Sequence, residues 1–238
     1  MSGDKESQRE FKELVKETRS LLKSFQASGT AEVPKGSDPA GSDPSGSSLN
    51  LADKERMLEP IRGKALVCLD CRLCKTRNKV VFGEGSLDAE LVFVGEGPGR
   101  DEDEQGRPFV GAAGKLLDKI IQAMKMSREE VYICNIVKCR PPQNRPPEPD
   151  EIAACGKYLE RQLLTIRPKV ICALGKTAAS ALLETAAPMG ALRGRTLAWK
   201  EIPLIVTYHP AYLLRNPAAK KDVWEDMQIV LRLLAENP

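Results

Sequence analysis

The pattern of apolar and polar positions from about residue 49 onward predicts strands and helices in alternation. Four apolar runs of strand length read as buried strands: Leu91–Val94, Val131–Val137, Val170–Leu174 and Leu204–Tyr208. Apolar residues at helical spacing predict helices over 50–66, 115–125, 150–166, 176–184 and the C-terminal residues. Strands that alternate with helices form a parallel sheet covered on both faces. The sequence therefore predicts an α/β fold of three α/β/α layers with a four-stranded parallel central sheet.

The first 48 residues follow a different pattern. Apolar residues at helical spacing cross a charged segment and predict an amphipathic helix over 5–27, which either packs on the main domain or binds a partner protein. Residues 28–48 contain GSDPAGSDPSGSS, a composition typical of a flexible tether. We therefore divide the chain into an N-terminal helix over 1–27, a linker over 28–48 and a compact domain over 49–238.

The stretch Gly95–Gly114, GEGPGRDEDEQGRPFVGAAG, connects the first predicted strand to a helix. A long loop in this position lies at the carboxyl edge of an α/β sheet, where ligands bind. It does not match two familiar nucleotide motifs. A dinucleotide fingerprint needs glycine where Arg100 stands, and a phosphate loop needs serine or threonine where Leu116 follows Gly114-Lys115.

Charge and composition narrow the functional classes. The net charge is +3; residues 1–50 contribute −1 (7 basic, 8 acidic), so the remainder carries +3 − (−1) = +4. This surplus permits nucleic-acid binding without requiring it. The charged N-terminus does not resemble a signal peptide, and no apolar run has membrane length, so we expect a cytoplasmic protein without a membrane partner.

Seven cysteines in a reducing compartment indicate metal binding or reactivity rather than disulfides. Cys68 and Cys71 form a C-x-x-C pair, and Cys139 and Cys155 follow in distant segments. Four soft thiolates suit either an iron–sulfur cluster or a structural zinc ion. Cys74 extends the first pair, and its role stays open. Two further cysteines fall inside predicted strands and are expected to be buried apolar residues, namely Cys134 and Cys172.

Four ordered motifs now resemble one known family. C-x-x-C before VVFGEG, then GEGPGRDEDEQGRPFVGAAGKLLD, NIVKCRPPQNRPPEPDEIAAC and YHPAYLLR resemble the thermostable, iron–sulfur class of uracil-DNA glycosylase, usually called family four. The resemblance runs from about Cys68 to the C-terminus. It implies a monofunctional hydrolase that flips uracil out of DNA, cleaves its N-glycosidic bond and leaves an abasic site. It also implies that a 4Fe-4S cluster is held by four cysteines, namely Cys68, Cys71, Cys139 and Cys155.

Three residues are candidates for recognising the base. Phe109 is an aromatic residue in a polar loop, where a base stacks or where the ring anchors the loop. Asn135 interrupts an apolar strand; its amide can donate to uracil O4 and accept from N3–H, or satisfy backbone groups at the strand end. His209 is the only histidine of the chain. The resemblance implies that it binds uracil O2, where negative charge develops.

The resemblance assigns further residues to the site. Glu96 belongs to the pocket, holding water or the sugar side. The next position is an aspartate in the best-known branch of the superfamily, and Gly97 here leaves the water-activating group open. Glu102 either crowds the C5 face against thymine or is a solvated charge. The C-terminal motif implies a wedge that fills the gap of the flipped base, with an arginine on phosphate: Tyr212, Leu213, Leu214 and Arg215.

Two other functions stay open. The chain is alternatively a noncatalytic DNA-binding module carrying zinc or a cluster, or a glycosylase for another deaminated base. No lysine stands out as a Schiff-base nucleophile, so lyase activity is not expected. We expect a monomer whose partner is uracil-containing DNA.

Overall fold

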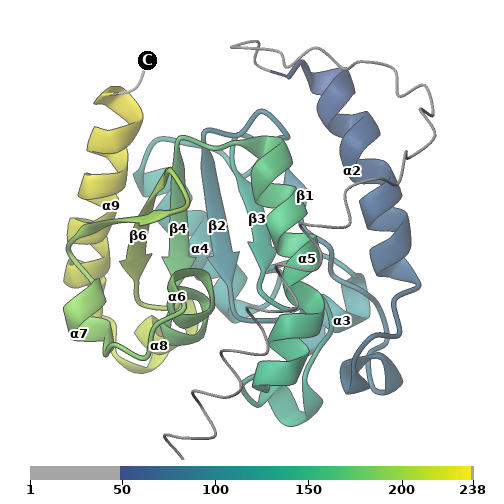
Figure 1. The fold of residues 1–238 in the computed structure, drawn as a ribbon. Helices are drawn as coiled ribbons and strands as arrows, with labels where there is room; N and C mark the ends of the chain where they lie inside the picture. Colours follow the sequence, from purple (N-terminus) through teal and green to yellow (C-terminus); the bar gives the residue numbers. More distant parts are fainter. Residues whose placement is uncertain (1–48, 237–238) are drawn as a thin grey trace, which may run out of the picture. The chain divides into compact units, whose positions relative to one another are not determined.

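The computed structural model describes residues 49–236; the predicted helix over 1–27 and linker over 28–48 lie outside these residues. The described chain contains one six-stranded sheet in the order β1-β3-β2-β4-β6-β5 (Figure 1). Its strands are β1 (Glu84–Gly85), β2 (Leu91–Gly95), β3 (Tyr132–Asn135), β4 (Val170–Leu174), β5 (Thr196–Trp199) and β6 (Ile202–Thr207).

The four predicted strands are confirmed as the parallel centre of this sheet. β2 pairs with β3 and β4, and β4 pairs with β6, all in parallel register. Every residue of β2, β3 and β4 is buried, as expected for strands covered on both faces. The two edge strands, β1 and β5, pair antiparallel and are not predicted from the sequence. β1 has two residues and β5 is half exposed, so neither produces an apolar run.

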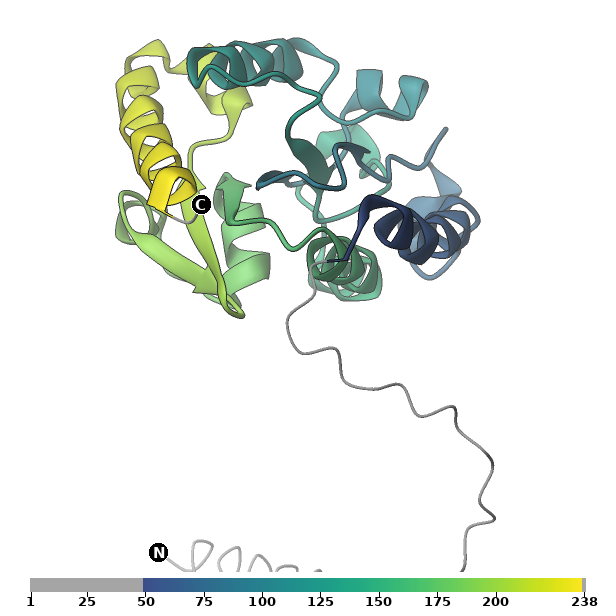
Figure 2. The ribbon, with the colours of Figure 1, turned by 90° about the horizontal axis from the view of Figure 1, so that it is seen from above.

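Helices cover both faces of the sheet, which confirms the three layers. α2 (Leu51–Leu66), α5 (Pro149–Ile166) and α6 (Lys176–Leu183) share one apolar core with the sheet. The opposite core contains α4 (Ala112–Ala123), α8 (Pro210–Arg215) and α9 (Lys220–Glu236). Figure 2, seen from above, separates α4 and α9 from α5 across the strands. The shorter helices are α3 (Arg100–Gln105), α7 (Met189–Leu192), η1 (Arg72–Lys75), η2 (Pro142–Asn144) and η3 (Pro217–Ala219).

The sequence predicts one long loop between β2 and α4, whereas the structure forms the helix α3 within it. Three acidic residues occupy the first turn of α3, where the helix dipole favours negative charge. Glu102 also reaches back to accept from the Gly99 N–H at 3.1 Å, and Gly106 ends the helix with a left-handed φ of 78°. Local capping therefore turns an acidic loop into a short helix.

All four parallel strands end at one edge of the sheet. β2 ends at Gly95, β3 at Asn135, β4 at Leu174, and β6 leads two residues later into His209. The chain passes from β2 to β3 on one side and then to β4 on the other, so the strand order reverses at β2. Such a reversal opens a crevice at the carboxyl ends, where α/β proteins bind ligands. No helix among residues 49–236 is long and apolar enough to cross a membrane.

Candidate active site

A cavity of about 490 Å³ opens at the carboxyl edge of the sheet, and we call it the edge pocket. Its volume falls in the range of small-molecule sites. The walls come from the ends of β2, β3 and β4 and from the start of α8. The structure brings eight of the predicted site residues together here: Glu96, Gly97, Glu102, Phe109, Asn135, His209, Tyr212 and Arg215.

Asn135 ends β3 inside the edge pocket and is 1% exposed. Its Oδ1 is the one buried side-chain oxygen or nitrogen of the described residues that has no hydrogen-bond partner. A buried acceptor without a donor is costly, so this atom is suited to a ligand that brings one. Gly95 makes room for it: a Cβ there would lie 2.4 Å from Asn135 Oδ1 and 2.6 Å from Phe109 Cζ.

Phe109 is 6% exposed, with its ring in the edge pocket and its backbone in the left-handed region at φ 51°. This conformation is strained for a residue with a side chain and must be held by its surroundings. Glu102 holds one side, because its Oε1 accepts from the Val110 and Gly111 amides at 2.9 Å each. Arg128 holds the other side by donating to the carbonyls of Pro108 and Phe109.

These contacts bear on one of the two alternatives for Glu102. Its carboxylate is not a solvated charge, because both oxygens accept from backbone amides. The residue lines the pocket and shapes the Phe109 loop. Arg128 is anchored in turn by ion pairs of 2.7 Å to Glu84 and to Asp118. The loop is thus fixed from two directions.

His209 caps the N-terminus of α8, and its Nδ1 accepts from the Ala211 N–H at 3.2 Å. Because Nδ1 accepts, the ring proton of the neutral imidazole resides on Nε2. Burial lowers the pKa of His209 to about 4, and the charge of Arg215 acts in the same direction, while Glu102 opposes it. The imidazole is therefore neutral at physiological pH. Its ring lies 5.6 Å from that of Phe109, centroid to centroid.

Glu96 accepts a hydrogen bond from the hydroxyl of Thr177, which is the second residue of α6. Glu96 and Glu102 are the two carboxylates among the residues lining the pocket. Glu102 is occupied by backbone amides, whereas Glu96 lines the pocket with a side-chain hydroxyl as its hydrogen-bond partner. A side chain at Gly97 is excluded, because its Cβ would lie 2.8 Å from Val137 Cγ2.

The helix α8 presents an aromatic stack at the pocket rim. The Tyr208 and Tyr212 rings lie 4.8 Å apart, and the Arg193 guanidinium lies 4.4 Å from the Tyr208 centroid. Tyr212 and Leu214 are 38% and 50% exposed. The predicted wedge role is wrong for Leu213. Its side chain is 1% exposed and belongs to the apolar core beneath the sheet, so it cannot reach DNA. Neighbouring residues of a helix point about 100° apart, so Leu213 can face the core while Leu214 faces the surface.

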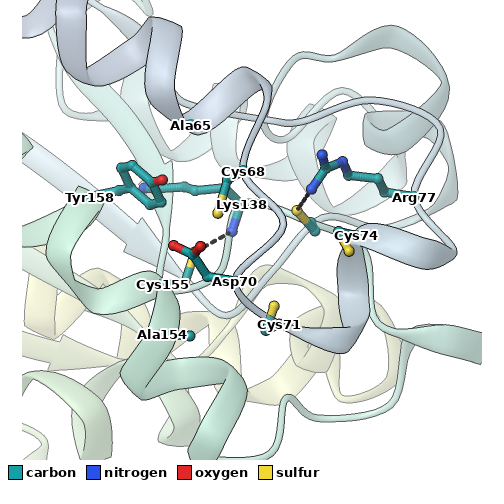
Figure 3. Close-up of a pocket in the computed structure, with 11 residues that line it drawn as sticks. Ala65, Cys68, Asp70, Cys71, Cys74, Arg77, Lys138, Ala154, Cys155 and Tyr158 are labelled. Carbon is teal, nitrogen blue, oxygen red and sulfur yellow. Dashed lines mark hydrogen bonds between the residues drawn. The ribbon is translucent and has the colours of Figure 1, made fainter.

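Five cysteines line a second cavity beside α2 and α5, which we call the cysteine cavity (Figure 3). They are the four predicted ligands and Cys74, and all five are free thiols. The described residues contain no group of three or more potential ligands gathered as if around a single metal ion. The remaining two cysteines, Cys134 and Cys172, are fully buried in β3 and β4, which confirms their expected role.

Hydrogen-bond donors point at two of these sulfurs (Figure 3). Arg77 Nη1 lies 3.2 Å from Cys139 Sγ, and the Lys138 N–H donates to Cys155 Sγ at 3.2 Å. Burial raises the pKa of the Cys139 thiol to about 11, opposed by Arg77. A bound metal would favour the thiolate form instead.

Salt bridges hold the cysteine segment against α5. Arg72 contacts Asp150 at 2.6 Å, and Lys157 pairs with Asp70. Arg145, which lines the edge pocket, binds Glu151 at 2.7 Å, and Glu151 is 0% exposed. The segment that carries the first cysteines and the rim of the edge pocket are thus joined to the same end of one helix.

Comparisons with known proteins agree with this geometry. A family model for the uracil DNA glycosylase superfamily matches residues 82–228. A type-4 uracil-DNA glycosylase of Thermotoga maritima is 46% identical over 182 residues, which cover 74% of this chain and 93% of that protein. One of Saccharolobus solfataricus is 44% identical over 190 residues, covering 76% and 88%. A type-5 uracil-DNA glycosylase of Pyrobaculum aerophilum is 30% identical over 149 residues, covering 56% and 66%.

The chain belongs to the type-4 uracil-DNA glycosylase family. The resemblance drawn from the four motifs is thereby confirmed. In this type-4 family member the matched superfamily region begins at Phe82, so the first cysteine pair and α2 precede it.

Three residues of this type-4 site are missed by reading the sequence. In the sequence Arg128 looks like an ordinary charged surface residue after a helix, yet its side chain holds the Phe109 loop. Thr177, next to a lysine at a helix start, binds Glu96. Lys138 looks like part of a basic loop but is 1% exposed. Its position directly after a strand was the one available signal, since that place lies at the functional edge.

Proposed function

We propose that this chain is a monofunctional uracil-DNA glycosylase that hydrolyses the N-glycosidic bond of deoxyuridine in DNA. One observation carries the proposal: an aromatic ring, a partnerless amide oxygen and a neutral imidazole line the same edge pocket, namely Phe109, Asn135 and His209. An extruded pyrimidine offers a flat face, an N3–H donor and an O2 acceptor to these groups. The relatives named above are glycosylases of the same base.

Asn135 would select uracil through hydrogen bonding. Its Oδ1, which has no protein partner among the described residues, would accept from uracil N3–H, and its Nδ2 would donate to O4. Cytosine presents an acceptor at N3 and a donor at C4, so two buried polar groups would face like groups. A site built on such pairing rejects the wrong base strongly.

His209 would stabilise the leaving group. With Nδ1 occupied by the Ala211 amide, the Nε2–H of the neutral ring is the donor available to uracil O2. Negative charge accumulates on O2 as the glycosidic bond breaks, and a fixed donor there typically contributes ~2.7–4 kcal/mol. The ring of Phe109, held at 5.6 Å from the imidazole, would stack on the base.

Glu96 would act on the sugar side. Thr177 orients its carboxylate, and the exclusion of a side chain at Gly97 leaves no alternative acid at the next position. A carboxylate at this place stabilises a developing sugar cation and orients the attacking water. A dissociative reaction needs mainly this electrostatic support, so a strong base is not required.

The rim of the edge pocket would bind the DNA strand. Arg145, Lys176 and Arg215 line the pocket and supply positive charge for phosphates. Tyr212 and Leu214 are the exposed apolar groups of α8 that would occupy the space of the flipped base. Uracil-containing DNA is the partner that this surface fits.

The cysteine cavity fits a 4Fe-4S cluster. Its donor set is entirely thiol, drawn from two distant segments, with N–H donors directed at two sulfurs. Cys68, Cys71, Cys139 and Cys155 would hold it, with Cys74 as a spare thiol. When bound, the cluster would join the first cysteine segment to α5 and the loop after β3. Free thiols available for ligation also agree with an enzyme of the reducing cytoplasm.

The test is base excision from labelled oligonucleotides. Duplexes carrying a single uracil, hypoxanthine or thymine are incubated with the protein and then cleaved with alkali at abasic sites. We expect cleavage at uracil and none at thymine, with the rate of His209→Ala lowered by ~10²–10³-fold. Cleavage at hypoxanthine alone would instead establish a glycosylase for another deaminated base. A colourless, inactive protein with stoichiometric zinc would establish the DNA-binding module.

A further inference from the structure

A buried lysine lies between the cysteine cavity and the edge pocket. Lys138 follows β3, is 1% exposed and lines the cysteine cavity (Figure 3). Its Nζ donates to the carbonyl oxygen of Asn135 at 2.8 Å and to Gln162 Oε1 at 2.6 Å. Both acceptors are neutral, and among residues 49–236 no carboxylate forms an ion pair with this ammonium.

The neutral partners are fixed and cannot supply the missing charge. Gln162 is 0% exposed, and its Nε2 donates to the Phe82 carbonyl at 2.8 Å and to the Tyr132 hydroxyl at 2.9 Å. These two bonds set the amide so that its oxygen faces Lys138. The hydrogen bonds of Gln162 are thus satisfied, but the charge of the ammonium is not balanced by these partners. An ammonium buried without an anion is strongly unfavourable.

The cysteines beside Lys138 are the groups that would become anions on binding a cluster. The backbone N–H of Lys138 donates to Cys155 Sγ at 3.2 Å, and Cys139 is its neighbour in the chain. Four thiolates around a 4Fe-4S core leave a net negative charge, because they outweigh the charge of the core. This negative charge is buried on the Lys138 side, since Cys139 and Cys155 are 7% and 8% exposed.

We propose that Lys138 is the internal counter-charge of the thiolate-bound cluster and the positioning residue that links it to Asn135. Lys138 lines the cysteine cavity, and its ammonium donates to the carbonyl of Asn135, the residue proposed to read the base. The inference rests on the cluster proposed above. It explains why a lysine, rather than an apolar residue, fills this place in the core.

The test compares the reduction potential of the cluster in wild type, Lys138→Met and Lys138→Gln, all as full-length protein. Removing a positive charge beside the cluster makes the more negative, reduced form less stable. We expect both variants to lower the midpoint potential by at least a tenfold change in the reduction equilibrium, about 59 mV for one electron. Lys138→Gln keeps a hydrogen-bond donor and guards against a variant that fails to fold.

Lys157→Met is the matched control. Lys157 also lies near the cysteine cavity through Asp70, but its side chain is 57% exposed and its charge is screened by water. Its loss is expected to leave the potential close to wild type. A wild-type midpoint potential in both Lys138 variants would overturn the proposal that Lys138 is the counter-charge of the cluster.

Binding separates the two parts of the proposal. Lys138→Met is expected to weaken binding of uracil-containing DNA more than Lys138→Gln, which retains a donor to the Asn135 carbonyl. Equal binding by the two variants would overturn the positioning role. Iron and sulfide analysis of the wild type distinguishes these results from failure of the cofactor proposal, because a wild type without iron would refute the cluster itself.

Discussion

At the residue scale, the edge pocket depends on which polar atoms the protein satisfies itself. His209 gives its Nδ1 to the Ala211 amide, so one donor remains. Asn135 leaves Oδ1 without a partner among the described residues. Each unmade bond is costly in the empty pocket and is recovered when a ligand supplies the complement. The specificity proposed for the pocket therefore rests on polar atoms that the protein itself leaves unsatisfied.

The substitution Asn135→Asp should change the pattern of hydrogen-bond donors and acceptors that the pocket offers to the base. A carboxylate can still accept from uracil N3–H but cannot donate to O4, so the rate of uracil excision should fall on the order of 100-fold, because one hydrogen bond is replaced by a repulsive contact between two oxygens. Cytosine, whose amino group donates to a carboxylate, should become a detectable substrate. Both rates are measured under single-turnover conditions on matched oligonucleotides.

Asn144→Asp is the control for this change. Asn144 lines the same pocket, and its Oδ1 accepts from Arg140 Nε at 2.7 Å, a bond that aspartate retains. Selectivity in this variant should match wild type. If Asn135→Asp keeps both its activity and its preference for uracil, Asn135 does not read the base.

The lowered pKa of His209 makes a second prediction at this scale. With a pKa of about 4, the imidazole stays neutral above about pH 5, so it should contribute no step to the excision rate between about pH 5 and 8. The chain has a single histidine, so its imidazole carbon-bound proton signals in an NMR pH titration are unambiguous. A titration midpoint near 6.5 would contradict the neutral donor.

The same shift has a consequence for stability. On unfolding, His209 returns to its ordinary pKa of 6.5 and takes up a proton at any pH between about 4 and 6.5. Unfolding is therefore favoured as the pH falls through this window. The unfolding free energy of wild type should decrease more steeply there than that of His209→Gln, as measured by urea denaturation.

At the element scale, the loop between α3 and α4 is held in a strained form by charges on other elements. Arg128 binds two loop carbonyls and is itself anchored by Glu84 of β1 and Asp118 of α4. Its side chain is 18% exposed. The edge strand β1, although two residues long, therefore contributes to the position of Phe109.

Arg128→Met should release this loop. We expect a loss of stability on the order of 3 kcal/mol, because two carboxylates and two carbonyls lose a largely buried partner. Excision should also slow markedly, because the base loses its stacking ring. Urea denaturation and single-turnover excision provide the two measurements.

Arg107→Met is matched to it, because Arg107 also binds Glu84, at 2.8 Å, but is 60% exposed and does not contact the loop carbonyls. This exposed pair should contribute about 1 kcal/mol or less. An equal loss of activity in both variants would mean that Glu84 pairing matters and the clamp on Phe109 does not.

Elements with a strong local pattern are predictable from the sequence. The runs around Phe93, Ile133, Cys172 and Ile205 are continuous and apolar because both faces of the strands are covered, so their apolar character and short length identified them. Chain order then placed Asn135 and His209 at one edge, since parallel strands end together.

Other features depend on tertiary contacts that leave no local pattern. β1 becomes a strand by pairing with β3, and Arg128 becomes a clamp through partners ten or more residues away. Lys138 carries a charge but is buried, which reverses the usual preference of lysine for the surface. Leu213 and Leu214 are identical in type, and only the orientation of α8 separates core from surface.

At the scale of the whole described domain, two cavities share one set of supports. The end of β3 places Asn135 in the edge pocket, and the segment that follows places Cys139 in the cysteine cavity. The N-terminal end of α5 binds Arg145 of the pocket rim and Arg72 of the cysteine segment through adjacent carboxylates. A group that joins the cysteines would therefore stabilise the rim without contacting the base.

Loss of the cluster should consequently weaken DNA binding more than it alters base selectivity. In Cys155→Ser the loop after β3 and α5 lose their shared ligand, so we expect loss of iron, a lower unfolding temperature and a higher Kd for uracil-containing DNA.

Cys74→Ser provides the matched control, since Cys74 lines the same cavity but is predicted to be spare. It should retain wild-type iron content and affinity. Loss of iron in Cys74→Ser, with retention of iron in Cys155→Ser, would mean that Cys74 and not Cys155 is the ligand. Retained affinity in iron-free Cys155→Ser would show that the rim is stable without the cluster.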